Sequence, residues 1–405
     1  MFIFFAVISE LIYLFLAIKS EFFGLLDLHD NSTAVLIVVL LSILFICYFC
    51  TYRFTKWKKV NIRTIFVISL LFHITFLFIP FLTSNDLFTY IFQTRIFPYL
   101  GGNPYLDIYN VFPQDLIFNS VKTIWSEKTT LYGPLFLLIG GLINSIGRNN
   151  LILITFLFKF LLIGTNMLNV FLVYKISKST KAIFLYGLNP LVIFELVGNA
   201  HNESLLIFFL FISLLLLFKR SIKSFGALIA SILIKYSTFI FLPLYLILIK
   251  KKGWKNLVAA FALGVLMIVI FYLPFWGGFD IFNYQISYYR SQFVSPSLGV
   301  SIGKIIFGSY EMSFNINTLI FFLVVAGITV KAYFSKLKLK EFTFYLFIIY
   351  LVYLLTKLNM VLPWYLTPLV ALASLCVTWK KYERYVIKCL IFVSIYSLLL
   401  YYFVR

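Results

Sequence analysis

Residues 34–52 read AVLIVVLLSILFICYFCTY, and the basic stretch Arg53–Arg63 follows directly. An α-helix rises about 1.5 Å per residue, so a run of this length crosses a hydrocarbon layer of about 30 Å. Similar apolar runs, separated by short basic stretches, recur to the end of the chain. This pattern predicts an all-α fold, a polytopic bundle of transmembrane helices joined by turns.

The composition and the placement of charge define the class of protein. Of 405 residues, 62% are hydrophobic and 12% are charged, which is more apolar surface than a soluble domain of this size can bury. The net charge of +20 does not indicate a nucleic-acid partner, because 23 of the 34 basic residues fall in six clusters between apolar runs. By the positive-inside rule these clusters mark cytoplasmic turns, which also contact anionic membrane lipids. The clusters lie at residues 53–63, 175–181, 219–223, 250–255, 331–340 and 380–388.

With these clusters inside, the sequence predicts about 13 spans in a single membrane domain over residues 1–405. The first run is interpreted as a retained span rather than a cleaved signal, since it lacks a basic start and a small-residue cleavage site. Residues 225–249 are predicted to form a short hairpin, because one long span would place Lys250–Lys252 outside. The runs are Phe2–Ile18, Ala34–Tyr52, Ile62–Leu82, Leu151–Tyr174, Ala182–Val197, Ser204–Phe218, Phe225–Tyr236, Phe239–Ile249, Leu257–Pro274, Ile316–Tyr333, Phe342–Thr356, Pro363–Trp379 and Tyr385–Phe403.

Two long connections fall on the predicted outer side. Residues 83–150 are too long for a simple turn and too rich in Phe, Tyr, Leu and Ile for disorder, so they are predicted to form an outer catalytic loop. Within this loop, Leu135–Ile146 is predicted as a helix at the outer interface. Residues 275–315 form a second outer loop. Because most acidic residues also fall outside, the active site is expected on the outer face of the cell membrane.

Asp86 heads the first outer loop, in the stretch Ser84-Asn85-Asp86. Ionisable groups so close to a membrane span usually serve function. One interpretation makes one of these three residues the N-cap of a helix over Leu87–Phe97. The other makes Asp86 a general base, because partial desolvation raises the basicity of a carboxylate that is ionised at neutral pH. Arg95, in the same predicted helix, either pairs with a phosphate or carboxylate or snorkels to the interface.

Further polar and aromatic residues belong to the same outer side. His201 and Glu203 suit two ligands of a metal, but no third ligand is visible, so contact with a polar substrate group is preferred and no metal is expected. Lys235, at the tip of the predicted hairpin, either meets a phosphate or snorkels. Trp364 and Tyr365 form either an aromatic belt or a stacking surface for a sugar or lipid.

Taken in order, these motifs resemble one family. They look like the polyprenol-phosphate-dependent glycosyltransferases of the GT-C fold, and most like the bacterial α-mannosyltransferases. The resemblance covers about residues 60–380. It rests on Asp86 after an apolar run, Gly-Gly-Asn-Pro-Tyr at 101–105, Tyr-Gly-Pro-Leu at 132–135, Asn-Pro-Leu at 189–191, Gly-Asn-Ala-His-Asn-Glu at 198–203, Lys-Tyr-Ser at 235–237 and Pro-Trp-Tyr-Leu at 363–366.

The resemblance implies an inverting glycosyltransferase of a prokaryotic cell membrane. Its donor is a polyprenyl-phosphate sugar, most simply mannose, its acceptor is a glycan or glycolipid, and it needs no cofactor. Asp86 is the expected catalytic base. The alternatives are a transporter or flippase of lipid-linked sugars, and a structural assembly partner. The expected substrate-binding residues are Arg95, Asn103, Tyr105, Tyr132, His201, Asn202, Glu203, Lys235, Arg290, Trp364 and Tyr365.

Overall fold

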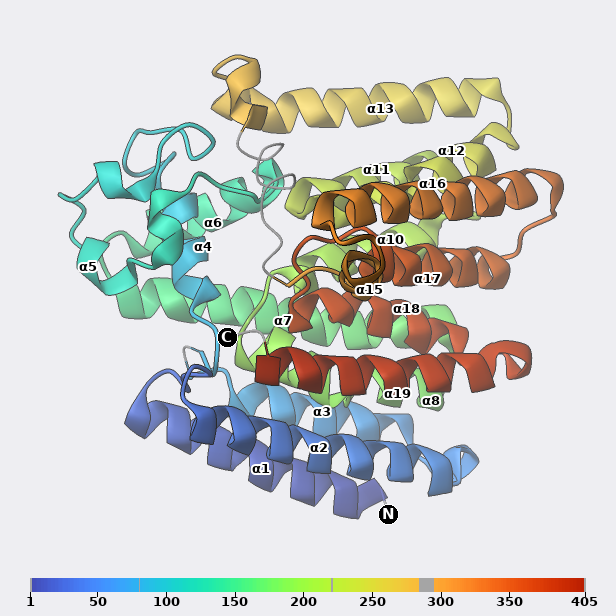
Figure 1. Ribbon diagram of the computed structural model, residues 1–405, viewed down its shortest axis with the longest axis horizontal. Coiled ribbons are helices and arrows are strands. Elements are labelled where there is room, and N and C mark those ends of the chain that lie inside the picture. Colours follow the sequence, from blue (N-terminus) through green and yellow to red (C-terminus); the bar gives the residue numbers. More distant parts are fainter. Residues whose placement is uncertain (1, 80, 220, 284–294, 404–405) are drawn as a thin grey trace.

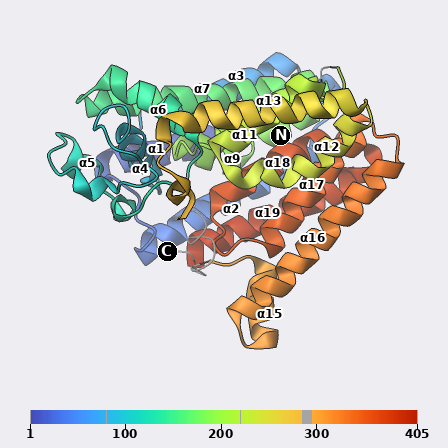
Figure 2. The same ribbon diagram turned by 90° about the horizontal axis from the view of Figure 1, so that it is seen from above.

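The computed structural model describes residues 2–79, 81–219, 221–283 and 295–403, and in these residues the fold is helical, with one isolated bridge between Ser295 and Met360. The long helices lie side by side in a bundle, with a helical lobe at one end (Figure 1). Seen at 90° to this view, α15 (Leu298–Phe307) and the start of α16 stand out from one corner (Figure 2). The predicted all-α membrane fold is confirmed.

Seven helices in the described ranges are long and apolar enough to cross a membrane. An eighth span arises if α8 (Thr180–Gly187) is joined to the segment Pro190–Gly198, which is bent from it by 44°. That segment comprises α9 (Pro190–Val192) and the π-helix η4 (Ile193–Gly198). The seven are α1 (Phe2–Phe23), α2 (Asn31–Phe54), α7 (Leu151–Ser177), α13 (Trp254–Tyr272), α16 (Tyr310–Phe334), α17 (Leu339–Thr356) and α19 (Lys380–Phe403).

The predicted count of about 13 spans is therefore not reached, although each of the 13 apolar runs contains helix. Five of the runs form shorter helical segments, whose length of about 21 Å falls short of a hydrocarbon core of about 30 Å. Several of these segments are almost wholly buried by the longer helices, so protein rather than lipid surrounds them. They are α3 (Ile62–Thr75), α10 (Glu203–Leu216), α11 (Ser221–Ile234), η5 with α12 (Tyr236–Phe241 and Leu242–Lys250), and η8 with α18 (Pro363–Leu366 and Thr367–Cys376).

The hairpin predicted within residues 225–249 is present. α11 ends at Ile234, Lys235 is extended, and η5 begins at Tyr236. Lys252, beyond the end of α12, donates to the carbonyl oxygens of Leu217 and Phe218, just before α11 begins. The two ends of the segment thus meet, and Lys235 lies at the remote tip.

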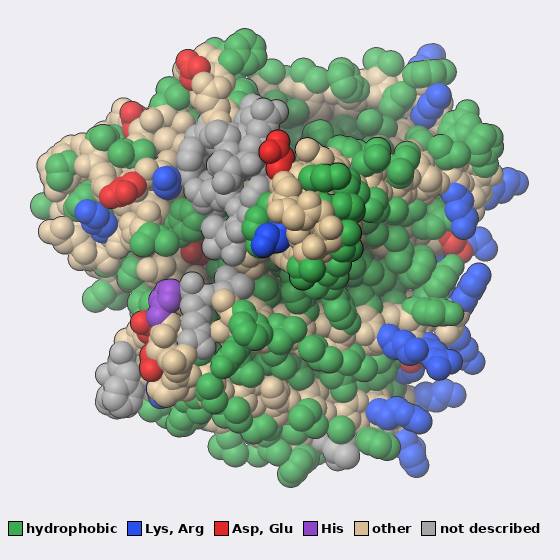
Figure 3. Space-filling model, viewed as in Figure 1, with side chains coloured by type: hydrophobic (Ala, Val, Ile, Leu, Met, Phe, Trp, Pro, Cys, Tyr) green, Lys and Arg blue, Asp and Glu red, His purple; other side chains and the backbone are tan. Residues whose placement is uncertain are grey.

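The basic turns gather at one end of the bundle, as Figure 3 shows at its right edge. Lys251 Nζ donates to the carbonyl oxygen of Ala332 at 2.9 Å, and Lys181 Nζ lies 2.7 Å from Glu383 Oε1. These contacts join four of the six basic clusters, as expected if they share one aqueous face.

Residues 83–150 build the lobe at the opposite end (Figure 1). Close packing of α4 on α6 depends on glycine, because a Cβ at Gly140 would lie 2.5 Å from the side chain of Thr94. The predicted helix over Leu135–Ile146 is present as α6. The helical segments of the lobe are α4 (Asp86–Arg95), η2 (Tyr109–Val111), α5 (Phe118–Val121), η3 (Ile124–Glu127) and α6 (Pro134–Gly147). The short helices outside it are η1 (Trp57–Lys59), η6 (Leu273–Phe275) and η7 (Phe279–Phe282).

Candidate active site

Asp86 is the first residue of α4, and its carboxylate does not cap the helix. Asn85 occupies the N-cap position without a side-chain hydrogen bond, and Ser84 Oγ accepts from the Asp86 backbone N–H at 3.3 Å. Of the three residues predicted as possible N-caps, Asn85 takes that position, and Asp86 lies inside the helix. Its Oδ2 lies 3.6 Å from Nδ1 of His201 instead.

The surroundings of Asp86 make its carboxyl group more basic than usual. The side chain is 14% exposed. Burial raises its pKa because the charged form loses water, while the positive charges of His201 and Lys235 act in the opposite direction. A carboxylate in such a site suits proton transfer.

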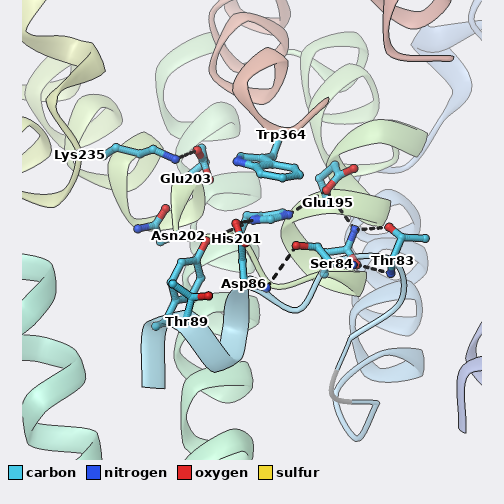
Figure 4. Close-up of polar contacts among 12 residues, drawn as sticks. Thr83, Ser84, Asp86, Thr89, Glu195, His201, Asn202, Glu203, Lys235 and Trp364 are labelled. Atoms are coloured by element: carbon cyan, nitrogen blue, oxygen red, sulfur yellow. Dashed lines mark hydrogen bonds and ion pairs between the residues drawn. The ribbon is translucent and has the colours of Figure 1, made fainter. Parts of the chain in front are cut away.

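His201 is the hub of the polar cluster, and contacts reach it from three directions (Figure 4). Its Nε2 lies 3.1 Å from Glu195 Oε2, and its Nδ1 lies 3.2 Å from the hydroxyl of Tyr90. Its ring is stacked on Trp364, with centroids 3.9 Å apart and planes 17° apart. The imidazole is buried and can change neither its position nor its orientation freely.

Asn199 ties the segment that carries Asp86 to the segment that carries Glu195. Its Oδ1 accepts from the three backbone N–H groups of residues 82–84, at 2.8–3.2 Å. Its Nδ2 donates to Glu195 Oε2 at 3.1 Å and to Thr83 Oγ1 at 3.0 Å. One amide therefore fixes the distance between the two carboxylates on either side of His201.

The backbone near His201 has two unusual features. Ile193–Gly198 is a π-helix, and Ala200 has a φ of 56°, a conformation that costs energy for a residue with a Cβ. Lys159 supports the turn by donating to the carbonyl oxygens of Val197 at 3.0 Å and Gly198 at 2.8 Å. Both π-helices and strained residues cluster at functional sites.

Lys235 closes the other side of the cluster. It forms a partly buried ion pair with Glu203, and its Nζ lies 4.5 Å from the ring centroid of Tyr365 and 6.0 Å from that of Tyr132. Among the residues that the structure describes, the two polar atoms of the buried Asn202 side chain and Oε2 of Glu203 have no hydrogen-bond partner. Such orphaned groups are costly unless a ligand satisfies them.

The cluster lies at the termini of several helices. These termini are on the side of the bundle opposite the basic turns. Asp86 and Glu203 occupy the first turns of α4 and α10, and Trp364 lies in η8 just before α18. The N-termini of helices carry partial positive charge and favour anions. Among the described residues no group of three His, Cys, Asp or Glu side chains is suited to hold a metal.

The structure brings together eight of the twelve predicted site residues. Arg95 is not among them: it is fully buried in a bidentate ion pair with Asp115, at 2.8 and 2.9 Å, and donates to Asn149. Its donors hold the lobe together, so its predicted contact with substrate has no support. The eight are Asp86, Tyr132, His201, Asn202, Glu203, Lys235, Trp364 and Tyr365.

Of the remaining predicted site residues, Asn103 and Tyr105 form hydrogen bonds that shape the loop. Asn103 donates to the carbonyl oxygen of Phe275 at 2.8 Å, and the hydroxyl of Tyr105 donates to the backbone carbonyl oxygen of Tyr132 at 3.0 Å. Both therefore support the wall behind Tyr132. Arg290 lies outside the described residues.

Sequence reasoning missed Glu195 and its partner Tyr401. Glu195 is fully buried, and the hydroxyl of Tyr401 donates to its Oε1. An acidic residue inside an apolar run is itself a functional signal, so the sequence contained the evidence needed to find Glu195. Tyr401, near the end of α19, carries no comparable signal.

An apolar groove follows the seam between α3 and α7. It consists of two hollows of about 620 and 560 Å³, both lined by Leu77. Phe88 and Lys159 line the first hollow, at the end near α4, and Gly164 lines the second.

The family described as "Alpha-(1->6)-mannopyranosyltransferase, N-terminal domain" matches residues 17–251, more than half of the chain. The chain belongs to this family. The match confirms the resemblance to bacterial α-mannosyltransferases. The matched region contains Asp86, Glu195, His201 and Lys235, while Trp364 and Tyr401 come from helices beyond it.

Two relatives illustrate the similarity to named members of the family. "Alpha-(1->6)-mannopyranosyltransferase A" of Corynebacterium glutamicum is 30% identical over 166 residues, which are 40% of this chain and 34% of the relative. The protein of the same name from Mycobacterium tuberculosis is 25% identical over 207 residues, which are 47% of this chain and 39% of the relative. The chain thus matches little more than a third of each relative's length. No solved structure matches the chain.

Proposed function

We propose that the protein is an inverting mannosyltransferase. It moves mannose from a polyprenyl-phosphate donor to a glycan or glycolipid acceptor on the outer face of a prokaryotic cell membrane. The observation that carries the proposal is the cluster around Asp86, where a basic carboxylate, the cation Lys235 and aromatic rings meet at the end remote from the basic turns. The names of the two relatives support mannose as the sugar.

In the proposed reaction, Asp86 takes the proton from the acceptor hydroxyl as that oxygen bonds to the anomeric carbon. The bond from this carbon to the phosphate oxygen breaks, and polyprenyl phosphate leaves with the electron pair. Its developing charge is stabilised by Lys235 and by the helix N-termini around the site. Trp364, Tyr365 and Tyr132 offer flat faces to the sugar.

The proposal is tested with purified protein in lipid, a polyprenyl-phospho-mannose donor and a mannoside acceptor. We expect release of polyprenyl phosphate together with a product whose anomeric configuration is opposite to that of the donor. Transfer from a nucleotide sugar, or retention of configuration, contradicts the proposal. Movement of the intact lipid-linked sugar across the bilayer, with no transfer, supports the flippase alternative instead.

Lys235→Gln is expected to weaken use of the donor more than Lys235→Arg, since the arginine retains the charge. Loss of a charge-assisted hydrogen bond of about 1.5–3 kcal/mol lowers kcat/KM for the donor by roughly 10- to 150-fold. The measurement is the steady-state kinetics of polyprenyl phosphate release. Because the single change strands the charge of Glu203, the double variant Lys235→Gln with Glu203→Gln serves as the control for misfolding. Parental donor kinetics in Lys235→Gln exclude a phosphate contact.

The groove between α3 and α7 supplies a path for the donor's hydrocarbon chain, and Gly164→Trp tests it. Among the described residues, a Cβ at Gly164 meets nothing within 4 Å, and Gly164 lines the second hollow, so a side chain added there extends into the groove. We expect KM for a long-chain donor to rise about tenfold, equivalent to roughly two lost CH2 contacts, while a short-chain donor is unaffected.

Gly327 provides the matched control for the groove variant. It also lies within a long apolar helix, α16, with open space around its Cβ position. Gly327→Trp should leave both donors at parental KM. Equal effects of the two tryptophans, or an equal loss with both donors, would argue against the groove.

A further inference from the structure

The buried pair of Glu195 and His201 is not required by the proposed reaction as written above. Glu195 is fully buried within a bundle of apolar helices, where an ionised carboxylate is costly unless it is paired and hydrogen-bonded. Its Oε2 faces both His201 and Asn199, and its Oε1 accepts from Tyr401. Every contact of the carboxylate therefore fixes its position beside the imidazole.

The imidazole in turn lies between two carboxylates. Its Nε2 side faces Glu195 at 3.1 Å, and its Nδ1 side faces Asp86 at 3.6 Å. Trp364 covers one ring face at 3.9 Å, which prevents the ring from rotating away. The separation from Asp86 is longer than a hydrogen bond, and catalytic contacts of this kind often shorten once substrate is bound.

We propose that Glu195 is a positioning residue that holds His201 in the orientation in which it supports Asp86 as the base. The inference rests on the proposed function, because it assigns a role within the same reaction. Glu195 touches no substrate, and its effect is transmitted through the imidazole.

The position of His201 matters because its charge acts on the pKa of Asp86. The positive charge of His201 acts to lower the pKa of Asp86, against the raising effect of burial, and so favours the ionised carboxylate. Of the four charged neighbours that act on the pKa of Asp86, His201 acts most strongly and Glu195 itself acts least. The groups that face His201 or lie one contact beyond it are Asp86 and Tyr90 from α4, Glu195 from η4, Glu203 from α10, Lys235 after α11 and Tyr401 from α19.

Glu195→Gln tests the inference, because glutamine keeps the size of the side chain and removes its charge. Activity requires ionised Asp86, so it rises with pH through the pKa of that carboxyl group. Once the imidazole is no longer held beside Asp86, its lowering effect on this pKa weakens, the pKa rises, and the acid limb of the kcat/KM profile moves to higher pH. We also expect kcat to fall roughly 10- to 100-fold, as for other carboxylates that orient a histidine, with KM for the donor close to parental.

Glu10→Gln is the matched control. Glu10 also lies in an apolar helix and also accepts from a hydroxyl, that of Thr75, but it belongs to α1 and does not contact the cluster. Its variant should keep the parental pH profile. A purely structural role for Glu195 would lower the melting temperature and leave the acid limb in place, and that result overturns the inference.

Glu195→Asp keeps the test decisive if the glutamine variant does not fold. The shorter side chain retains the charge but withdraws it from His201, so a smaller shift in the same direction is expected. A parental profile in this variant also overturns the inference. If the parent protein shows no transfer from a lipid-linked sugar, the proposed function fails first, and the two failures are thereby told apart.

Discussion

Asp86→Asn is expected to lower turnover of the lipid-linked sugar by on the order of 10²–10⁴, while the protein folds like its parent. Asparagine preserves the size and polarity of the side chain but cannot take the proton from the acceptor hydroxyl. The change also leaves the start of α4 intact, because Ser84 rather than Asp86 bonds the backbone there. Loss of activity without loss of stability therefore identifies the base.

Asp107→Asn is the control for the Asp86 variant. Asp107 lies in the same lobe, where its Oδ2 accepts from the backbone N–H of Asn103 at 2.6 Å, and among the described residues it does not contact the cluster. Its variant should retain parental turnover. If Asp86→Asn is also near-parental, Glu203 becomes the next candidate, since Asp115 is committed to Arg95.

Arg95→Met is expected to destabilise the lobe by about 3–5 kcal/mol, the usual result of breaking a buried ion pair from one side. The side chain is fully buried, and Asp115 would be left charged with only Tyr109 donating to it at 2.7 Å. Arg95 also bonds the carbonyl oxygen of Arg148 and the side chain of Asn149, so one residue fastens α4 to the connection before α7. Thermal unfolding in detergent measures the loss.

The double variant Arg95→Met with Asp115→Leu separates the structural role from a substrate role. Apolar replacement of both partners is often close to neutral, so the double variant should recover much of the lost stability. Donor kinetics, measured below the melting temperature of each variant, should remain near parental. A folded Arg95→Met protein with normal stability and poor donor use would restore the phosphate role predicted from the sequence.

The helices could be predicted from the sequence, because an apolar run or a basic turn is recognised from neighbouring residues alone. The hairpin around Lys235 was predicted from the charges of Lys250–Lys252, and the ends of that hairpin meet as expected. The number of spans was not predictable in the same way. Whether a run such as Ile62–Leu82 continues as helix or ends at Thr75 depends on what packs around it, and composition alone does not reveal this.

The site was only partly predictable for a related reason. The motif residues themselves were found, but the partner of Arg95 lies 20 positions away in an irregular loop. The contact of Glu195 with His201 depends on a π-helix and on a positive φ at Ala200, and neither feature has a clear sequence pattern. The N-cap was likewise ambiguous among Ser84, Asn85 and Asp86, and the backbone places Asn85 there.

His201 lies inside the part of the chain that matches the family, whereas Trp364, which stacks on it, lies outside that part. The family match ends at residue 251, yet the ring that covers the imidazole comes from more than 100 positions later. In the proposed reaction, the base therefore comes from the matched part of the chain, and the ring that covers His201 comes from the part beyond it. A change in the C-terminal part can alter the aromatic surface offered to a sugar and leave the proposed base in place. Selectivity should therefore be traced by exchanging the C-terminal helices between relatives rather than by altering the shared half.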